Sequence, residues 1–186
     1  MKRRLRVIMV VPAVFAAFFF LAGLSSSAFS EDNPTKWRQL PDMRFGINIP
    51  STHPAPLVAD DWQCRDPRPV SDVHFWGSYL GWEVERPNPT LPAPGVEGFW
   101  IRIYEDVPAF APDVPYSHPG LLLYEQEVRV FTEQYMVSIS HPDGLFEHKF
   151  YYSLDLPEPF VQNEGTIYWL SVAAIMREET QYPWGW

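Results

Sequence analysis

The chain has 186 residues, of which 20% are charged and 46% hydrophobic, as expected for one folded domain and not for a disordered or multi-domain chain. Its net charge is −9, and it becomes −13 when residues 1–30, with four basic and no acidic side chains, are left out. Such an acidic body repels phosphate backbones and anionic lipids, so the composition excludes nucleic acids as partners and argues against anionic membrane surfaces.

The N-terminus has the pattern of a secretory signal peptide. Four basic residues lie within the first six positions, residues 7–23 are apolar, and residues 24–30 end in the cleavage-like triplet Ala28-Phe29-Ser30. We expect a cleaved signal peptide over residues 1–30. The alternative is an uncleaved anchor, because the apolar run approaches the roughly 18–20 residues that span a bilayer. The prediction is a secreted protein, extracellular or periplasmic, whose mature part does not span a membrane.

Proline divides the rest of the chain into short strands. Nineteen of the 20 prolines follow residue 30, and they fall between apolar alternations, which leaves little room for long helices. The alternations predict strands at residues 57–62, 70–82, 98–105, 121–130, 148–156 and 166–176. Residues 86–95 and 106–119 are expected to be Pro-rich connections, residues 132–135 a single helical turn, and residues 141–144 a turn.

The alternation also predicts which side chains face the core. The inward sets are Val73, Phe75 and Tyr79; Phe99, Ile101 and Ile103; and Phe150, Tyr152, Leu154 and Leu156. Strands at this spacing without βα alternation predict an all-β fold, an antiparallel β-sandwich or jelly roll. We place this domain at residues 57–186, after an N-terminal extended segment at residues 31–56.

Five short runs resemble a known group of proteins. They are residues 59–62 (ADDW), 73–79 (VHFWGSY), 98–104 (GFWIRIY), 119–124 (PGLLLY) and 165–171 (GTIYWLS). Their order and spacing are similar to those of a family of uncharacterised secreted bacterial β-sandwich domains, often found in PEP-CTERM-type surface proteins. The resemblance covers most of residues 37–186. It implies an extracellular β-sandwich of unknown function, and it supplies no catalytic residues.

Nothing in the sequence predicts a catalytic site, a cofactor or a metal. The motifs G-x-S-x-G and H-E-x-x-H and a Gly-rich phosphate loop do not occur. Cys64 is the only cysteine, which excludes an internal disulfide, and we expect it to be buried.

Two further groups of side chains are considered as metal ligands, but their spacing in the sequence gives little support. Three histidines precede prolines in loops that could meet at a metal, but no chelating spacing supports this. A structural calcium at Asp60, Asp61, Asp66 and Asp72 is the other alternative, against a simple solvated acidic surface.

Aromatic side chains are the remaining feature, at 16% of the chain. If the predicted inward sets are correct, Trp76, Trp100 and Tyr104 point outward, with Arg102 between the last two. An aromatic strip of this kind can stack on the apolar faces of sugars, so Trp76, Trp100, Arg102 and Tyr104 are the predicted ligand-binding residues. The alternative is that a loop or the tryptophans at residues 184 and 186 cover the strip.

These observations favour an exported, non-enzymatic module that binds polysaccharide at the cell surface. A second hypothesis is a structural module that binds other proteins of an extracellular assembly through a hydrophobic terminal segment. A third is a hydrolase with carboxylates from the Pro-rich loops. An exposed aromatic strip would favour the first, exposed residues Trp184 and Trp186 the second, and paired carboxylates in a cleft the third.

Overall fold

A computed structural model describes residues 35–43, 46–55, 57–82, 95–111, 114–177 and 182–186. The chain divides into residues 1–34 and a compact unit formed by residues 35–186, and the description below concerns this unit. The expected signal peptide and most of the Pro-rich connection at residues 86–95 lie outside the described residues.

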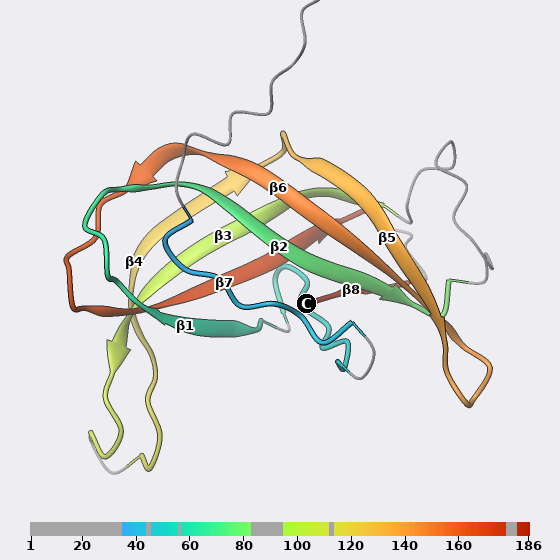
Figure 1. Cartoon of the computed structure of the whole chain (residues 1–186), viewed down its shortest axis with the longest axis horizontal. Coiled ribbons are helices and arrows are strands. Elements are labelled where there is room, and N and C mark those ends of the chain that lie inside the picture. Colours follow the sequence, from blue (N-terminus) through green and yellow to red (C-terminus); the bar gives the residue numbers. More distant parts are fainter. Residues whose placement is uncertain (1–34, 44–45, 56, 83–94, 112–113, 178–181) are drawn as a thin grey trace, which may run out of the picture. The chain divides into compact units, whose positions relative to one another are not determined.

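The described part of the chain is built from β-strands and contains no helix. The strands are β1 (Ala59–Gln63), β2 (Val70–Leu80), β3 (Val96–Val107), β4 (His118–Val128), β5 (Thr132–Ser140), β6 (Phe146–Phe160), β7 (Ile167–Met176) and β8 (Trp184–Gly185). They form two four-stranded antiparallel sheets (Figure 1), with orders β1-β7-β3-β4 and β5-β6-β2-β8. We call them the β3 sheet and the β2 sheet. The predicted antiparallel β-sandwich is confirmed.

The core lies between the two sheets and holds the predicted inward side chains. Phe99 and Ile101 from the β3 sheet pack in one cluster with Phe75, Tyr79 and Tyr152 from the β2 sheet. The rings of Phe75 and Phe99 meet edge to face with centroids 4.9 Å apart, a favoured geometry for aromatic pairs. Alternation along each strand therefore leaves the intervening side chains on the two outer faces.

Two expectations differ from the structure. Residues 132–135 are not a helical turn but the start of β5, since β5 pairs with β6 from Thr132↔Ser153 onward. The expected connection at residues 106–119 is shorter, because β3 extends to Val107 and β4 begins at His118. In both places a hydrogen-bonded neighbour strand decides the conformation over local propensity. The turn at residues 141–144 forms as expected, with Gly144 at φ 86°.

The segment before β1 contacts both sheets. The backbone N–H of Ser51 donates to the carbonyl of Trp184 in β8, at 3.1 Å, and the N–H of Ala174 in β7 donates to the carbonyl of Ser51, at 2.9 Å. Ser51 is buried, and its hydroxyl donates to the carbonyl of Val172, at 2.7 Å. The expected boundary at residue 57 therefore lies inside the compact unit, and the segment brings His53 to the β3 sheet.

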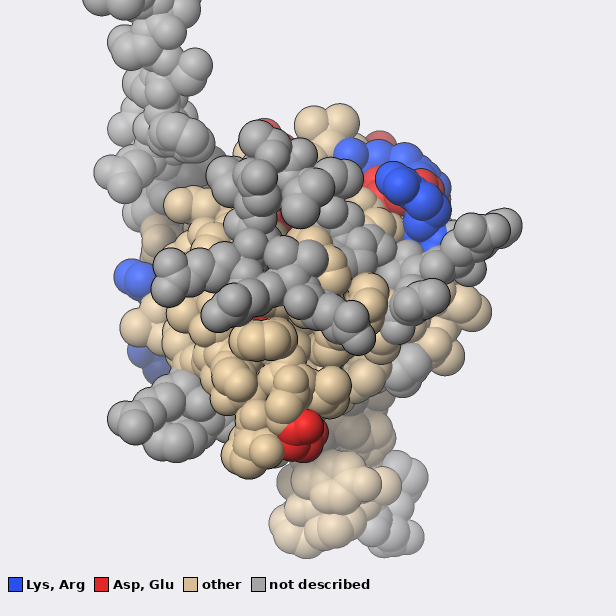
Figure 2. All heavy atoms as spheres, turned by 90° about the vertical axis from the view of Figure 1, so that its right-hand side faces the viewer, with Lys and Arg blue, Asp and Glu red and all other residues tan. Residues whose placement is uncertain are grey.

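Several charged side chains on the surface form ion pairs. On the face in Figure 2, the largest group of Lys and Arg atoms contains Asp and Glu as well, a few more Lys or Arg atoms lie at the opposite edge, and most of the visible described surface is uncharged. Arg129, for example, pairs with Glu127 at 2.5 Å and with Glu97 at 3.7 Å. No uniformly basic patch is seen on this face. No helix among the described residues is long and apolar enough to cross a membrane.

His148 makes the stability of the fold sensitive to acid. Its ring is fully buried, with Nε2 2.7 Å from the carbonyl oxygen of Trp82 and Nδ1 2.6 Å from the hydroxyl of Ser138. Burial lowers the pKa of His148, and the hydrogen bond to Trp82 opposes this only in part. The unfolded chain therefore binds more protons below a pH of about 6.5, and the free energy of unfolding falls as the pH is lowered, by up to about 1.4 kcal/mol per pH unit.

The variant His148→Gln is expected to flatten this dependence, because glutamine keeps one donor and one acceptor and does not titrate. Burial raises the pKa of Glu133, so this carboxyl group makes the free energy of unfolding rise as the pH is lowered. Its contribution is the same in the parent and in His148→Gln, so it does not affect the comparison. Urea unfolding between pH 5 and 7 measures the slopes. Equal slopes for the parent and the variant would contradict the assignment to His148.

Candidate functional site

The outer face of the β3 sheet carries three of the four predicted binding residues. Trp100, Arg102 and Tyr104 lie on β3, alternating with the buried Phe99, Ile101 and Ile103. The guanidinium carbon of Arg102 lies 5.1 Å from the centroid of the Trp100 ring, within the range of a cation–π interaction. Trp100 and Tyr104 are half-buried, so each ring presents part of its surface to solvent.

The Arg102 guanidinium is held in place by two neighbours, but one of its nitrogens has no hydrogen-bond partner. Only 8% of the residue is exposed. Its Nε donates to Glu125 on β4 at 2.5 Å, and its Nη2 lies 3.4 Å from Nδ1 of His53. Its Nη1 is buried and has no hydrogen-bond partner. Because a buried guanidinium donor without a partner is costly, this nitrogen is suited to a ligand oxygen or a water molecule.

Ser171 supplies a second buried polar group without a hydrogen-bond partner, beside the first. It lies on β7 directly opposite Arg102 in the antiparallel register, where side chains on the same face are neighbours. Ser171 is 2% exposed, and its hydroxyl oxygen is also buried without a partner. A donor and a hydroxyl thus lie next to each other on the face that carries the rings.

Aromatic groups border these polar atoms. The His53 ring lies 5.4 Å from that of Trp100. Trp169 lies opposite Tyr104 in the register, and its Nε1 donates to Asp106 at 2.8 Å. Burial raises the pKa of Tyr104, and the carboxylate of Glu125 adds to this while Arg102 opposes it. The Tyr104 hydroxyl therefore stays protonated at neutral pH and can donate a hydrogen bond.

The fourth predicted residue, Trp76, lies elsewhere. It is on β2, which belongs to the other sheet, and it points to that sheet's outer face beside Tyr151, with ring centroids 5.2 Å apart. Outer faces of a sandwich point away from each other, so the single four-residue strip is not formed. The site on the β3 sheet instead includes His53, Trp169 and Ser171, which the sequence analysis did not select.

The alternative ligand sets are dispersed in the structure. His53 lies beside Arg102, His118 beside Tyr116, and His141 beside Glu147. Among the acidic residues proposed for calcium, Asp66 pairs with Arg68, and Asp72 lies 3.0 Å from His74. Across the described ranges, no group of three His, Cys, Asp or Glu side chains could hold a metal ion.

Removing the Ser171 hydroxyl is expected to stabilise the unliganded protein. Ser171→Ala eliminates a buried group that has no partner, so the free energy of unfolding should rise by up to about 1 kcal/mol. Thermal unfolding of the two proteins without ligand measures this change. Ser51→Ala is the matched control, because the Ser51 hydroxyl is buried but bonded to Val172, and this variant should be less stable. A lower free energy of unfolding for Ser171→Ala than for the parent would contradict the claim that the Ser171 hydroxyl has no hydrogen-bond partner.

The fold and this surface define an antiparallel β-sandwich whose β3 sheet has an outer face with aromatic rings around a buried arginine. The chain matches the domain of unknown function DUF7901 over residues 35–186 and belongs to that family. No curated protein and no solved structure matches the chain. The match begins where the compact unit begins, and it agrees with the expected membership in a family of uncharacterised domains.

Proposed function

We propose that the protein is an exported, non-catalytic module, extracellular or periplasmic, that binds an uncharged polysaccharide on the outer face of the β3 sheet. The observation that carries the proposal is the buried guanidinium of Arg102, with a free Nη1 beside the free hydroxyl of Ser171 and between the rings of Trp100 and Tyr104. Aromatic faces stack on the C–H faces of pyranose rings, and the two polar groups suit sugar hydroxyls.

The surrounding charges favour a neutral polymer. Glu125 and Glu127 flank the site on β4, and the only guanidinium within it is already paired with Glu125. A polyanion would meet repulsion from these carboxylates and from the negative chain as a whole. Binding through stacking and hydrogen bonds then depends only weakly on salt.

A structural role in protein assembly is the second candidate, and one feature supports it. Leu121, Leu122 and Leu123 are exposed on β4, which is an edge strand of the β3 sheet, and exposed apolar edges pair with other chains. The terminal segment first considered for this role is not available, since Trp184 is fully buried in the core. The hydrolase hypothesis has no support in the described site, where Glu125 is engaged by Arg102.

Affinity electrophoresis of the full chain in gels containing neutral or acidic polysaccharides tests the proposal. We expect a neutral polymer to retard the parent protein and to have little effect on Trp100→Ala. Trp37→Ala is the matched control, because it removes an exposed indole that belongs to neither sheet, and it should behave like the parent. Migration unchanged by every polymer, or equal retardation of Trp100→Ala, would overturn the proposal and favour the structural role.

A further inference from the structure

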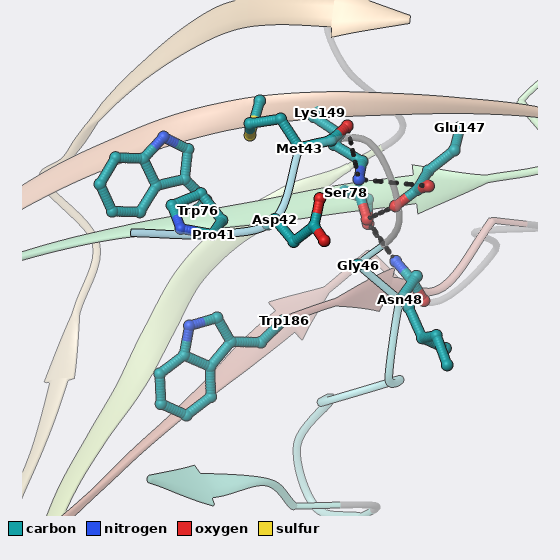
Figure 3. Close-up of a pocket in the computed structure, with 12 residues that line it drawn as sticks. Pro41, Asp42, Met43, Gly46, Asn48, Trp76, Ser78, Glu147, Lys149 and Trp186 are labelled. Carbon is teal, nitrogen blue, oxygen red and sulfur yellow. Dashed lines mark hydrogen bonds and ion pairs between the residues drawn. The ribbon is translucent and has the colours of Figure 1, made fainter. Parts of the chain in front are cut away.

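A pocket lies on the opposite outer face of the sandwich, over β2 and β6. Its volume is about 200 Å³, and its lining comes from β2, β6, the segment before β1, and Trp186 after β8 (Figure 3). Sites for drug-sized ligands usually measure about 300–1,000 Å³. The pocket is therefore of the size for one small ring and not for an extended chain.

Aromatic and apolar groups form one side of the pocket. Figure 3 shows the indoles of Trp76 and Trp186 together on this side, with Pro41 close to Trp76. Both indoles are half-buried, and Trp186 also packs against the core between the sheets. Two indoles beside a small cavity present the kind of surface that stacks on a sugar ring.

Polar groups in a fixed network form the other side. The buried carboxylate of Glu147 accepts from the hydroxyl of Ser78 at 2.7 Å and lies 3.6 Å from Nζ of Lys149. Nδ2 of Asn48 donates to the Ser78 hydroxyl at 2.6 Å, and Lys149 donates to the carbonyl of Met43 at 3.3 Å. Because these side chains hold one another, they offer hydrogen-bonding groups without a reorganisation cost.

The network contains one buried ion pair, and a further carboxylate lines the pocket. Glu147 is 2% exposed and Lys149 is 7% exposed, and the two are oppositely charged neighbours. Asp42 lines the same pocket, and its carboxylate lies between Trp76 and Ser78 in Figure 3. A phosphate or a carboxylate ligand would meet this acidic group, whereas sugar hydroxyls can donate to it.

We propose that this pocket is a second sugar site, which binds a single uncharged pyranose ring as a free monosaccharide or as the end of a glycan. The inference rests on the proposed function in one respect, namely that the protein recognises carbohydrate. It differs in what is recognised, because the open face of the β3 sheet accommodates the interior of a polymer and the pocket accommodates only one unit. The protein would thus have two sugar sites on opposite faces.

Saturation-transfer difference NMR on the full chain tests the pocket. The probes are glucose, galactose, mannose, xylose and N-acetylglucosamine, each added at millimolar concentration. We expect at least one to bind, with an affinity about tenfold lower in Trp76→Ala and in Trp186→Ala, the loss typical of a central aromatic contact. Trp76→Phe should recover part of the affinity, since a ring remains. Trp37→Ala should bind like the parent.

The variant Trp100→Ala separates this proposal from the first one. Monosaccharide binding that persists in Trp100→Ala, together with polymer retardation that persists in Trp76→Ala, supports two sites. Monosaccharide binding that is lost in Trp100→Ala but kept in both pocket variants overturns the pocket and leaves the β3 site standing. Absence of binding by all five sugars overturns the pocket alone, because polymer retardation is scored in a separate experiment.

Discussion

Replacing Trp184 with alanine is expected to lower the free energy of unfolding by about 3–5 kcal/mol, the range for a large aromatic removed from a core. Trp184 has no exposed surface. Its ring lies 5.3 Å from Phe99 and 5.9 Å from Tyr152, between centroids, so it contacts rings from both sheets. The Cα of Gly77 lies against this ring, because a Cβ there would come within 2.1 Å of it.

Urea unfolding of the full chain measures this effect. Trp37→Ala is the matched control, since that indole is 40% exposed and surface substitutions usually change stability by less than about 0.5 kcal/mol. A loss below about 1 kcal/mol in Trp184→Ala would mean that the ring is not a core residue. In that case the placement of the Trp184 ring between the two sheets would be wrong.

The variant Arg102→Lys is expected to weaken polysaccharide binding by at least about tenfold, which corresponds to about 1.4 kcal/mol. Arginine uses three separate nitrogens here, with Nε bonded to Glu125, Nη2 near His53, and Nη1 free for the ligand. Lysine has one nitrogen and no planar group to lie on Trp100, so it can keep the pair with Glu125 only by giving up the ligand contact.

Affinity electrophoresis at several polymer concentrations measures the dissociation constants. Arg68→Lys is the matched control, because Arg68 is an exposed arginine that pairs with Asp66 in the connection between β1 and β2, outside the predicted ligand groups, and we expect the affinity of this variant to change less than about twofold. Equal affinities for Arg102→Lys and the parent would show that Nη1 does not bind the sugar.

The strands and their inward faces were predictable because they depend on local alternation. Phe99 and Ile101 are fully buried as expected, and so is Tyr152. The same reasoning failed at residues 132–135, where a short polar stretch gives no alternation and the pairing of β5 with β6 decides the conformation. The strand expected at residues 121–130 is also displaced, since β4 begins at His118 and ends at Val128.

The site was predictable only in part, because alternation shows that a side chain points outward but not from which sheet. Trp76 lies on β2 and Trp100 on β3, and these two successive strands belong to different sheets. His53 reaches Arg102 through a segment that pairs with both sheets, a long-range contact without a local signal. Ser171 did have a signal, as the one serine inside the apolar run of residues 166–176.

Oxidation of tryptophan by N-bromosuccinimide, read by peptide mass spectrometry, tests the central claim most directly. The full chain is treated with and without a saturating amount of the polysaccharide that retards it most. Trp37 serves as the exposed reference and the fully buried Trp184 as the unreactive one. The account predicts that the polymer slows the oxidation of Trp100 and leaves that of Trp37 unchanged. Oxidation of Trp100 at the same rate with and without bound polymer would contradict it.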